Sequence, residues 1–413
     1  MDRAAKGGSE RAGRRASDGQ AQPAQGGARP KAQATGGQAN GGQSGRRSDG
    51  KSRARAGAQP NAQSGRRRKR GDTRSDPIYA ALDLGTNNCR LSIARPTPRG
   101  FQMIDAFSRI IRLGEGVSVS GQLSDAAIER TLDALKVCAS KMVRNEVTRS
   151  RMVVTEACRA AHNGAEFVQR VRRDVGMDLE ILSQEIEAQL AVSGCASLID
   201  DGCDYALVFD IGGGSSELIW LDIAKRRRQR EGKVGVPTDS TDCIAAWTSL
   251  PVGVVSLAEK FGGKYVQPQD FEDMVEWVSG LIQPFEAAHN FRDKIEAGRV
   301  HLLGTSGTVT TVAAIQLQLP RYDRRRVDGC WLDCADVRGV TYNLLAQTYE
   351  QRVAQPCVGR DRADLVLAGC AILEALMRAW PTKRLRVADR GLREGMLTNM
   401  MVEDGFRFVM RAR

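Results

Sequence analysis

The sequence lacks the features of membrane, secreted and disulfide-rich proteins. Its 413 residues contain no run of about 18 apolar residues, which excludes a transmembrane helix. No apolar segment follows the basic residues near the N-terminus, so we expect no secretory signal. The ten cysteines are scattered through a large chain, which is typical of reduced thiols. Cys330 and Cys334 have no second pair of zinc ligands nearby, since the chain has only three histidines. We therefore expect a cytoplasmic protein without membrane contact or structural zinc.

Residues 2–75 contain no Val, Ile, Leu, Phe, Tyr, Trp or Cys. A segment with nothing to bury cannot offset the entropy of ordering, so residues 1–76 are predicted to be a disordered arm rich in Gly, Ala, Gln and Arg. Residues 1–75 carry 18 Lys and Arg against 5 Asp and Glu, whereas residues 76–413 carry 43 against 44. The arm has either no partner or a weak affinity for polyanions through charge neutralisation. The near-neutral remainder has few aromatics, which argues against a dedicated RNA-binding protein.

Strands and polar turns occur twice in the same arrangement. Short apolar runs at 78–82 and 91–94 flank the turn 83–88, and runs at 206–209 and 217–221 flank the turn 210–216. The two turns begin with Asp83 and Asp210, 127 residues apart. A further apolar run at 300–303 leads into a third glycine-containing turn. Each turn alone is also compatible with an ordinary tight hairpin.

Helical and extended patterns alternate along the rest of the chain, which predicts an α/β fold. Ser124 is expected to cap a helix that starts at Asp125. Further helices are predicted at 164–175, from 184, at 364–377 and after 391, and further strands at 152–154, 179–182 and 385–387. The polar segment 155–159 is interpreted as a turn. The charged segments 225–230 and 324–326 are interpreted as loops.

The glycine turns have the chemistry of a phosphate site. Glycine lets backbone N–H groups approach a ligand closely, and Ser, Thr and Asn side chains add donors. Carboxylates at the strand ends would repel phosphate unless a divalent cation lay between them, and Mg²⁺ favours one or two carboxylates together with waters and phosphate oxygens. Three such turns in one chain therefore predict a Mg²⁺ and phosphate site.

The motifs also resemble those of a known family. Residues 83–88, 210–216 and 304–308 are similar to the glycine motifs of the actin/hexokinase/Hsp70 superfamily. Within it, the chain resembles the exopolyphosphatase/guanosine pentaphosphate phosphatase family, on the segments 112–116, 158–163, 183–188, 210–218, 249–253 and 389–395. The resemblance implies two ribonuclease H-like domains with mixed sheets and helices on both faces, flanking a cleft. We expect domain I at 77–183 and domain II at 184–395, with the last helix, about 396–413, returning to domain I.

The resemblance implies roles at matching positions. Glu187 corresponds to the catalytic glutamate that activates water, and Arg159 to an arginine that steadies the phosphoryl group. Asp83, Asp210 and Glu217 correspond to metal-binding positions. The positions expected to bind phosphate are Gly85, Thr86, Asn87, Asn88, Gly212, Gly213, Gly214, Ser215, Ser216, Gly304, Ser306 and Gly307.

Some features depart from the family pattern. Ile186 stands where members often have a second acidic residue, which bears on metal affinity or chain-end selectivity, and Ser216 replaces a commoner Thr. Larger members continue into a helical domain of the HD phosphohydrolase type. This chain ends 18 residues after Gly395 without a His-Asp dipeptide, so we expect a short form that lacks that domain.

The resemblance implies Mg²⁺-dependent hydrolysis of the terminal phosphoanhydride of polyphosphate, guanosine pentaphosphate or both. Family members are often dimers, so a homodimer is a further expectation. Two alternatives stay open: a small-molecule kinase or ATPase of the same superfamily, and a catalytically weak sensor of polyphosphate or guanosine polyphosphates. An acceptor requirement would indicate the kinase, and tight binding without hydrolysis would indicate the sensor.

Overall fold

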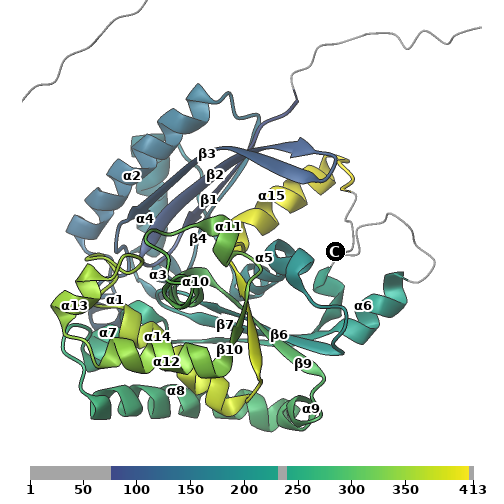
Figure 1. The fold of residues 1–413 in the computed structure, drawn as a ribbon. Helices are drawn as coiled ribbons and strands as arrows, with labels where there is room; N and C mark the ends of the chain where they lie inside the picture. Colours follow the sequence, from purple (N-terminus) through teal and green to yellow (C-terminus); the bar gives the residue numbers. More distant parts are fainter. Residues whose placement is uncertain (1–75, 231–239, 409–413) are drawn as a thin grey trace, which may run out of the picture. The chain divides into compact units, whose positions relative to one another are not determined.

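The computed structural model describes residues 76–230 and 240–408, and Figure 1 shows the arrangement of their helices and strands. The expected disordered arm falls, apart from its last residue, outside the described residues. No helix of the described part is long and apolar enough to cross a membrane. All ten cysteines are described, and all are free thiols, as expected.

A five-stranded sheet forms first in the chain, in the order β3-β2-β1-β4-β5. Its strands are β1 (Tyr79–Leu84), β2 (Asn88–Thr97), β3 (Gly100–Ile110), β4 (Arg149–Val154) and β5 (Glu180–Ile181). The first three strands are antiparallel, whereas β4 and β5 run parallel to β1. The accompanying helices are α1 (Val117–Ser120), α2 (Asp125–Arg144), α3 (Glu156–Ala160) and α4 (Gly164–Val175).

Alternation of side chains along β1 buries both faces of this sheet. Leu82 and Leu84 belong to a core shared with α2 and α4, whereas Tyr79 and Ala81 belong to a core shared with α15 (Leu392–Glu403). The Ser124 Oγ accepts from the Ala127 N–H at 3.3 Å, which confirms the predicted start of α2.

A six-stranded sheet follows in the order β10-β11-β9-β6-β7-β8. Its strands are β6 (Tyr205–Ile211), β7 (Ser216–Asp222), β8 (Ile244–Leu250), β9 (Val300–Thr305), β10 (Trp331–Asp333) and β11 (Arg384–Ala388). β6, β9 and β11 are parallel to one another, and the remaining pairs are antiparallel. The helices in this part are α5 (Gln184–Cys195), η1 (Ala196–Leu198), α6 (Ile223–Arg230), η2 (Ser240–Cys243), α7 (Val254–Phe261), α8 (Pro268–His289), α9 (Arg292–Glu296), α10 (Ser306–Gln316), α11 (Arg324–Val327), α12 (Cys334–Leu345), α13 (Tyr349–Ala354) and α14 (Val366–Ala379).

Helices cover both faces of the second sheet as well. Leu207 and Phe209 pack into a large core with α8, α10, α12 and α14, and Figure 1 shows α8, α12 and α14 in the lower part of the molecule. On the opposite face, Ala206 and Val208 pack against Ala188 of α5. Leu190 of α5 belongs to the core that Tyr79 and Ala81 of the first sheet share with α15, so α5 contacts both sheets.

Helices α5 and α15 approach each other closely at glycines. A Cβ on Gly194 would lie 2.0 Å from the Gly391 carbonyl oxygen, and one on Gly395 would lie 2.1 Å from that of Leu190. Because both neighbours are backbone atoms, no larger residue fits without moving a helix. This crossing fixes the start of α15 against the helix that carries Glu187.

The predicted fold class is confirmed: the chain is an α/β protein with two mixed sheets of ribonuclease H-like character and helices on both faces. The boundaries of the two expected domains, 77–183 and 184–395, stay a prediction. The final helix, α15, packs against β1 and α5.

Three polar segments predicted to lack regular structure are helical. The turn predicted at 155–159 contains α3, and the loops predicted at 225–230 and 324–326 lie in α6 and α11. Tertiary contacts explain α6, because the Arg226 side chain is buried and donates to the Ala196 carbonyl at 3.0 Å and to Asp201 at 3.2 Å. Arginine also favours helix, and charge alone therefore does not indicate a loop.

Candidate active site

The first glycine turn joins β1 to β2 and is closed by its own backbone. The Gly85 N–H donates to the Asn88 carbonyl at 2.9 Å, and Thr86 and Asn87 are 6% and 8% exposed. The Asn87 Oδ1 is buried and has no hydrogen-bond partner among the described residues. A buried acceptor of this kind is usually satisfied by a ligand or water.

The second glycine turn joins β6 to β7 and has the same closure. The Gly212 N–H donates to the Ser215 carbonyl at 3.0 Å. The carbonyls of Gly212 and Gly213 accept from the first amides of α7, at 3.0 and 2.8 Å. The turn is therefore anchored through its carbonyls, and its amides face the other way.

The two glycine turns touch each other. A Cβ on Gly213 would lie 2.8 Å from the Thr86 Cβ and 3.3 Å from the Asn87 nitrogen, and one on Gly214 would lie 2.9 Å from Glu156. The neighbouring residues Thr86 and Glu156 lie so close that only glycine fits at positions 213 and 214. Segments about 127 residues apart in the chain form one junction, as the repeated pattern predicted.

Among the amides at this junction that have no acceptor within residues 76–230 and 240–408 are those of Thr86, Asn87, Gly213 and Gly214. Clusters of unpaired backbone N–H groups bind anions, phosphate in particular. By contrast, the amides of Gly85 and Gly212 are used to close the turns.

Two predicted hydroxyl donors are already engaged. The Ser216 Oγ donates to the Val252 carbonyl at 2.7 Å, and the Ser215 Oγ donates to Glu217 at 2.7 Å. Their protons serve the local structure, so the donors left at this turn are the backbone amides. A phosphate role for these two side chains stays a prediction.

The third glycine motif is split between a strand and a helix. Gly304 lies inside β9, where a Cβ would be 2.6 Å from the Phe209 ring, so this glycine permits packing. Ser306 begins α10 with φ +79°, and its side chain partly opposes the rise in the pKa of Asp210. Gly307 has no atom within 4 Å of a Cβ position and borders open space.

Glu187 lies in the first turn of α5, which Ser183 caps by accepting from the Ile186 N–H at 3.3 Å. Its Oε2 is 2.7 Å from an Arg159 Nη, and only 14% of its side chain is exposed. Arg159 also pairs with Glu156 at 2.9 Å. Because Glu156 contacts Gly214, an unbroken series of contacts joins Glu187 to the glycine turns.

Four buried carboxylates lie in this region, and the pKa of each is raised, by burial first. Burial, and then the charge of Asp83, raises the pKa of Asp210 to about 6. Burial, and then Asp210, raises the pKa of Glu217 to about 7. Burial and Glu217 raise the pKa of Glu187 well above its usual range, although Arg159 opposes them. Burial also raises the pKa of Asp83.

This concentration of negative charge fits a divalent cation, which would relieve the mutual repulsion. Among the described residues, no three His, Cys, Asp or Glu side chains are grouped closely enough to hold a metal ion directly. Asp83, Asp210 and Glu217 fit Mg²⁺ as an ion that keeps several waters and contacts one or two carboxylates.

Sequence reasoning missed three residues of the site. Arg90 is opposite Asp83 in the β1–β2 ladder, and its charge lowers the pKa of Asp83, as does that of Arg393. Glu156 pairs with Arg159. The strand alternation after the first turn signals Arg90, but only the fold brings Arg393 next to Asp83.

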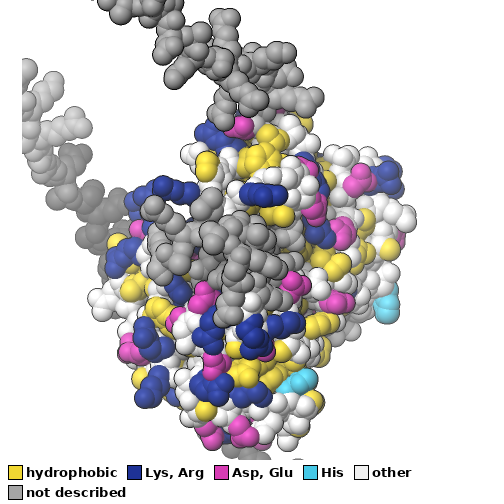
Figure 2. Space-filling model, turned by 90° about the vertical axis from the view of Figure 1, so that its right-hand side faces the viewer, with side chains coloured by type: hydrophobic (Ala, Val, Ile, Leu, Met, Phe, Trp, Pro, Cys, Tyr) yellow, Lys and Arg dark blue, Asp and Glu magenta, His cyan; other side chains and the backbone are white. Residues whose placement is uncertain are grey.

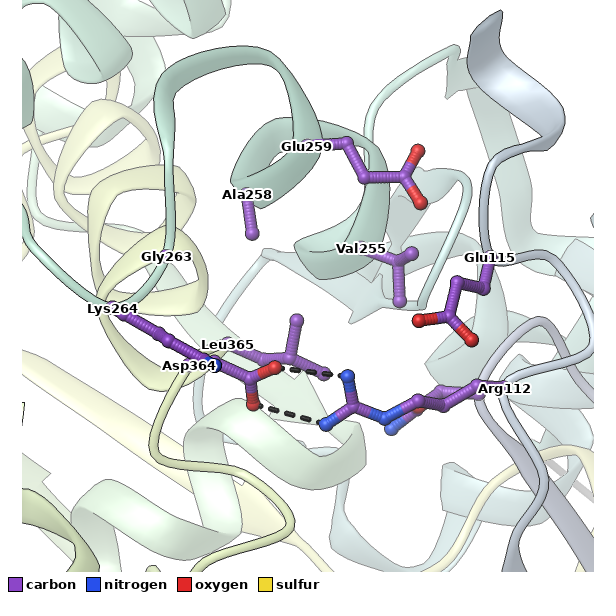
Figure 3. Close-up of a pocket in the computed structure, with 10 residues that line it drawn as sticks. Arg112, Glu115, Val255, Ala258, Glu259, Gly263, Lys264, Asp364 and Leu365 are labelled. Atoms are coloured by element: carbon purple, nitrogen blue, oxygen red, sulfur yellow. Dashed lines mark hydrogen bonds and ion pairs between the residues drawn. The ribbon is translucent and has the colours of Figure 1, made fainter. Parts of the chain in front are cut away.

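A cavity of about 330 Å³ adjoins Asn87, and Figure 3 shows its lining. Arg112 and Asp364 face each other across it in a two-pronged ion pair of 2.9 and 3.1 Å. Glu115 and Glu259 also line the cavity, so its carboxylates outnumber its cations, Arg112 and Lys264.

Residues 92–404 match the model of the Ppx/GppA phosphatase family. The chain belongs to this family. The match spans most of both sheets and confirms the resemblance drawn from the motifs.

The relatives of this Ppx/GppA chain include a named protein from Photobacterium profundum and a solved structure from Aquifex aeolicus. The guanosine-5'-triphosphate,3'-diphosphate pyrophosphatase of Photobacterium profundum is 27% identical over 337 residues, which cover 79% of this chain and 59% of the relative. The chain thus spans about three fifths of that relative's length. The crystal structure of the Aquifex aeolicus family member is 26% identical, with TM-score 0.62, and the match covers 80% of this chain and 99% of that one.

An exopolyphosphatase structure from Cytophaga hutchinsonii is similar in fold. It has a TM-score of 0.68 at 23% identity, over 80% of this chain and 99% of that one. The Ppx/GppA fold therefore extends over nearly all of the described residues.

Proposed function

We propose that this Ppx/GppA phosphatase hydrolyses the terminal phosphoanhydride of inorganic polyphosphate, guanosine pentaphosphate or both, in the presence of Mg²⁺. One observation supports this most strongly. Glu187 is held 2.7 Å from Arg159, in contact through Glu156 with a junction of two glycine turns that has unpaired amides within the described residues. The names of the relatives indicate the same substrate class.

In this proposal the amides of Thr86, Asn87, Gly213 and Gly214 bind the terminal phosphoryl group. Fixed donors of this kind stabilise developing charge without reorganisation. Arg159 orients Glu187 and can contact phosphate oxygens through its remaining donors.

Glu187 is the proposed general base. A base works best when its pKa lies near the working pH, and burial and Glu217 shift the pKa of this carboxyl in that direction. Glu187 takes a proton from the attacking water, and positioning by the surrounding backbone supplies the rest. Bound Mg²⁺, held by Asp83, Asp210 or Glu217, would neutralise charge on the phosphates.

The test compares Glu187→Gln with the wild type and with Glu185→Gln, a matched change on the exposed side of the same turn. Phosphate release from tripolyphosphate, long polyphosphate and guanosine pentaphosphate is measured with and without Mg²⁺. We expect Glu187→Gln to bind substrate but to lose about 10²–10⁴-fold in kcat, and Glu185→Gln to behave as the wild type. Wild-type turnover by Glu187→Gln would contradict the assigned role.

The same assays separate the alternatives. Tight binding of polyphosphate by the wild type with no release of phosphate would identify a sensor. Turnover that requires a second, phosphate-accepting molecule would identify a kinase. Either result would overturn hydrolysis as the function.

A further inference from the structure

A short arginine-rich segment lies beside the proposed phosphate site. Residues 321–326 include Arg321, Arg325 and Arg326, all exposed, and α11 is formed by the second half of the segment. Arg324, in the same helix, donates to Glu394 at 2.7 Å and to the Asp389 carbonyl. The segment is thereby fixed to the turn that precedes α15.

Two series of contacts connect this segment to the site. On one side, Arg324 donates to the Asp389 carbonyl, and the carbonyl of the next residue, Arg390, accepts from the Thr305 hydroxyl at 2.8 Å. Thr305 lies opposite Asp210 in the β6–β9 ladder. On the other side, Tyr322 donates to Asp389 at 2.7 Å and interacts with the Thr310 hydroxyl.

Thr310 donates to the Ser306 carbonyl at 2.9 Å, and Ser306 directly follows Thr305, which lies opposite Asp210 in the β6–β9 ladder. The segment therefore lies against α10, the helix that directly follows β9. Helix α11 contacts α10, and Figure 1 shows both near the middle of the molecule.

The charge of the segment suits an anion. In the described part of the chain, no ion pair is found for Arg321, Arg325 or Arg326, whereas Arg324 is paired with Glu394. The cavity near Asn87 has the opposite character, since Glu115, Glu259 and Asp364 line it. An anionic chain leaving the glycine junction is thus favoured on the α11 side and repelled on the cavity side.

We propose that Arg321, Arg325 and Arg326 bind phosphates of the substrate that lie farther from the scissile group than the three phosphates of tripolyphosphate reach. This inference rests on the proposed function. The ligand chemistry is a diphosphate or longer phosphate chain remote from the scissile group, which either the part of polyphosphate beyond its third phosphate or the 3'-diphosphate of guanosine pentaphosphate provides. Arginine binds such oxygens in a two-pronged geometry.

The test uses the full-length Arg325→Ala/Arg326→Ala protein. The matched control is Lys225→Ala/Arg228→Ala, which removes two exposed cations from α6, a basic helix on the face shown in Figure 2, where Lys and Arg side chains gather. Arg325→Lys/Arg326→Lys keeps the charges. Phosphate release is followed with tripolyphosphate, long polyphosphate and guanosine pentaphosphate at several salt concentrations.

We expect KM to rise about tenfold for long polyphosphate, guanosine pentaphosphate or both, and to depend less steeply on salt, because two phosphate contacts are lost. For the alanine variant, KM for tripolyphosphate and all kcat values should stay within about twofold of the wild type. The lysine variant should recover part of the affinity. The α6 control should match the wild type. If KM rises only for long polyphosphate or only for guanosine pentaphosphate, that substrate is the one whose phosphates the arginines bind.

Two failures are distinguishable. If the wild type releases no phosphate from any of the three substrates, the proposed function is wrong, and this inference falls with it. If the wild type is active and the alanine variant has unchanged KM for both long substrates, the inference alone is wrong. An equal rise in KM for tripolyphosphate also contradicts it, since the arginines would then act within the first three phosphates.

Discussion

His301 is a buried histidine that the fold keeps neutral. It is 4% exposed, and its Nε2 accepts from the Asp200 N–H at 3.1 Å. Burial lowers the pKa of His301 to about 4, below the value of about 6.5 for a free histidine. Between about pH 4 and pH 6.5, His301 binds a proton in the unfolded chain but not in the folded chain.

The free energy of unfolding should therefore fall as the pH drops from about 6.5 to 4, by about 3 kcal/mol from this residue alone. Above pH 6.5 the residue has no effect on the pH dependence. Urea unfolding of the wild type and of His301→Gln, which keeps an acceptor but cannot titrate, measures the difference. If both proteins lose the same free energy over this range, His301 does not titrate as described.

At the scale of the element, the crossing of α5 and α15 depends on Gly395. A methyl group there would lie 2.1 Å from a backbone oxygen of Leu190, so Gly395→Ala should cost about 1–3 kcal/mol or more and displace the helix that carries Glu187. Gly280→Ala is the matched control, because this exposed position in α8 has nothing within 4 Å.

In a helix interior, alanine is favoured over glycine by about 0.5–1 kcal/mol, so the Gly280→Ala control should be neutral or stabilising. Denaturant unfolding and phosphate release are measured on both variants. A Gly395→Ala protein with wild-type stability would show that the two helices are not in close contact there.

Helices and strands in which apolar residues recur at a regular spacing could be predicted from the sequence. The strands around both glycine turns, the Ser124-capped start of α2 and the start of α5 at 184 are predicted from alternation, helical spacing and the Ser124 N-cap, which are local signals; the Ser183 cap of α5 is not. The helices α3, α6 and α11 were not, because tertiary contacts such as those of Arg226 stabilise charged segments that look like loops.

The candidate site was predictable to a similar degree. Asp83, Asp210 and the glycines followed from the repeated turn, and Glu187 and Arg159 from the family resemblance. The sequence could not show that Ser216 donates its hydroxyl to Val252, or that Arg393 lies near Asp83. These contacts join segments far apart in the chain, and no local pattern marks them.

At the scale of the molecule, the site is assembled from both sheets. Thr86 comes from the five-stranded sheet and Gly213 from the six-stranded sheet, and they meet in direct contact. Away from this junction, the Arg112–Asp364 ion pair and the Gly116 N–H, which donates to Glu259 at 2.7 Å, link the same two parts. Catalysis as proposed requires these contacts to hold the glycine turns together.

A crystal structure of the Glu187→Gln protein with Mg²⁺ and tripolyphosphate would test this most directly. The account predicts a terminal phosphate on the amides of Thr86, Asn87, Gly213 and Gly214, with the side chain at position 187 facing it and Mg²⁺ near Asp83, Asp210 or Glu217. A terminal phosphate bound elsewhere, away from residues 85–87 and 212–214, would contradict it.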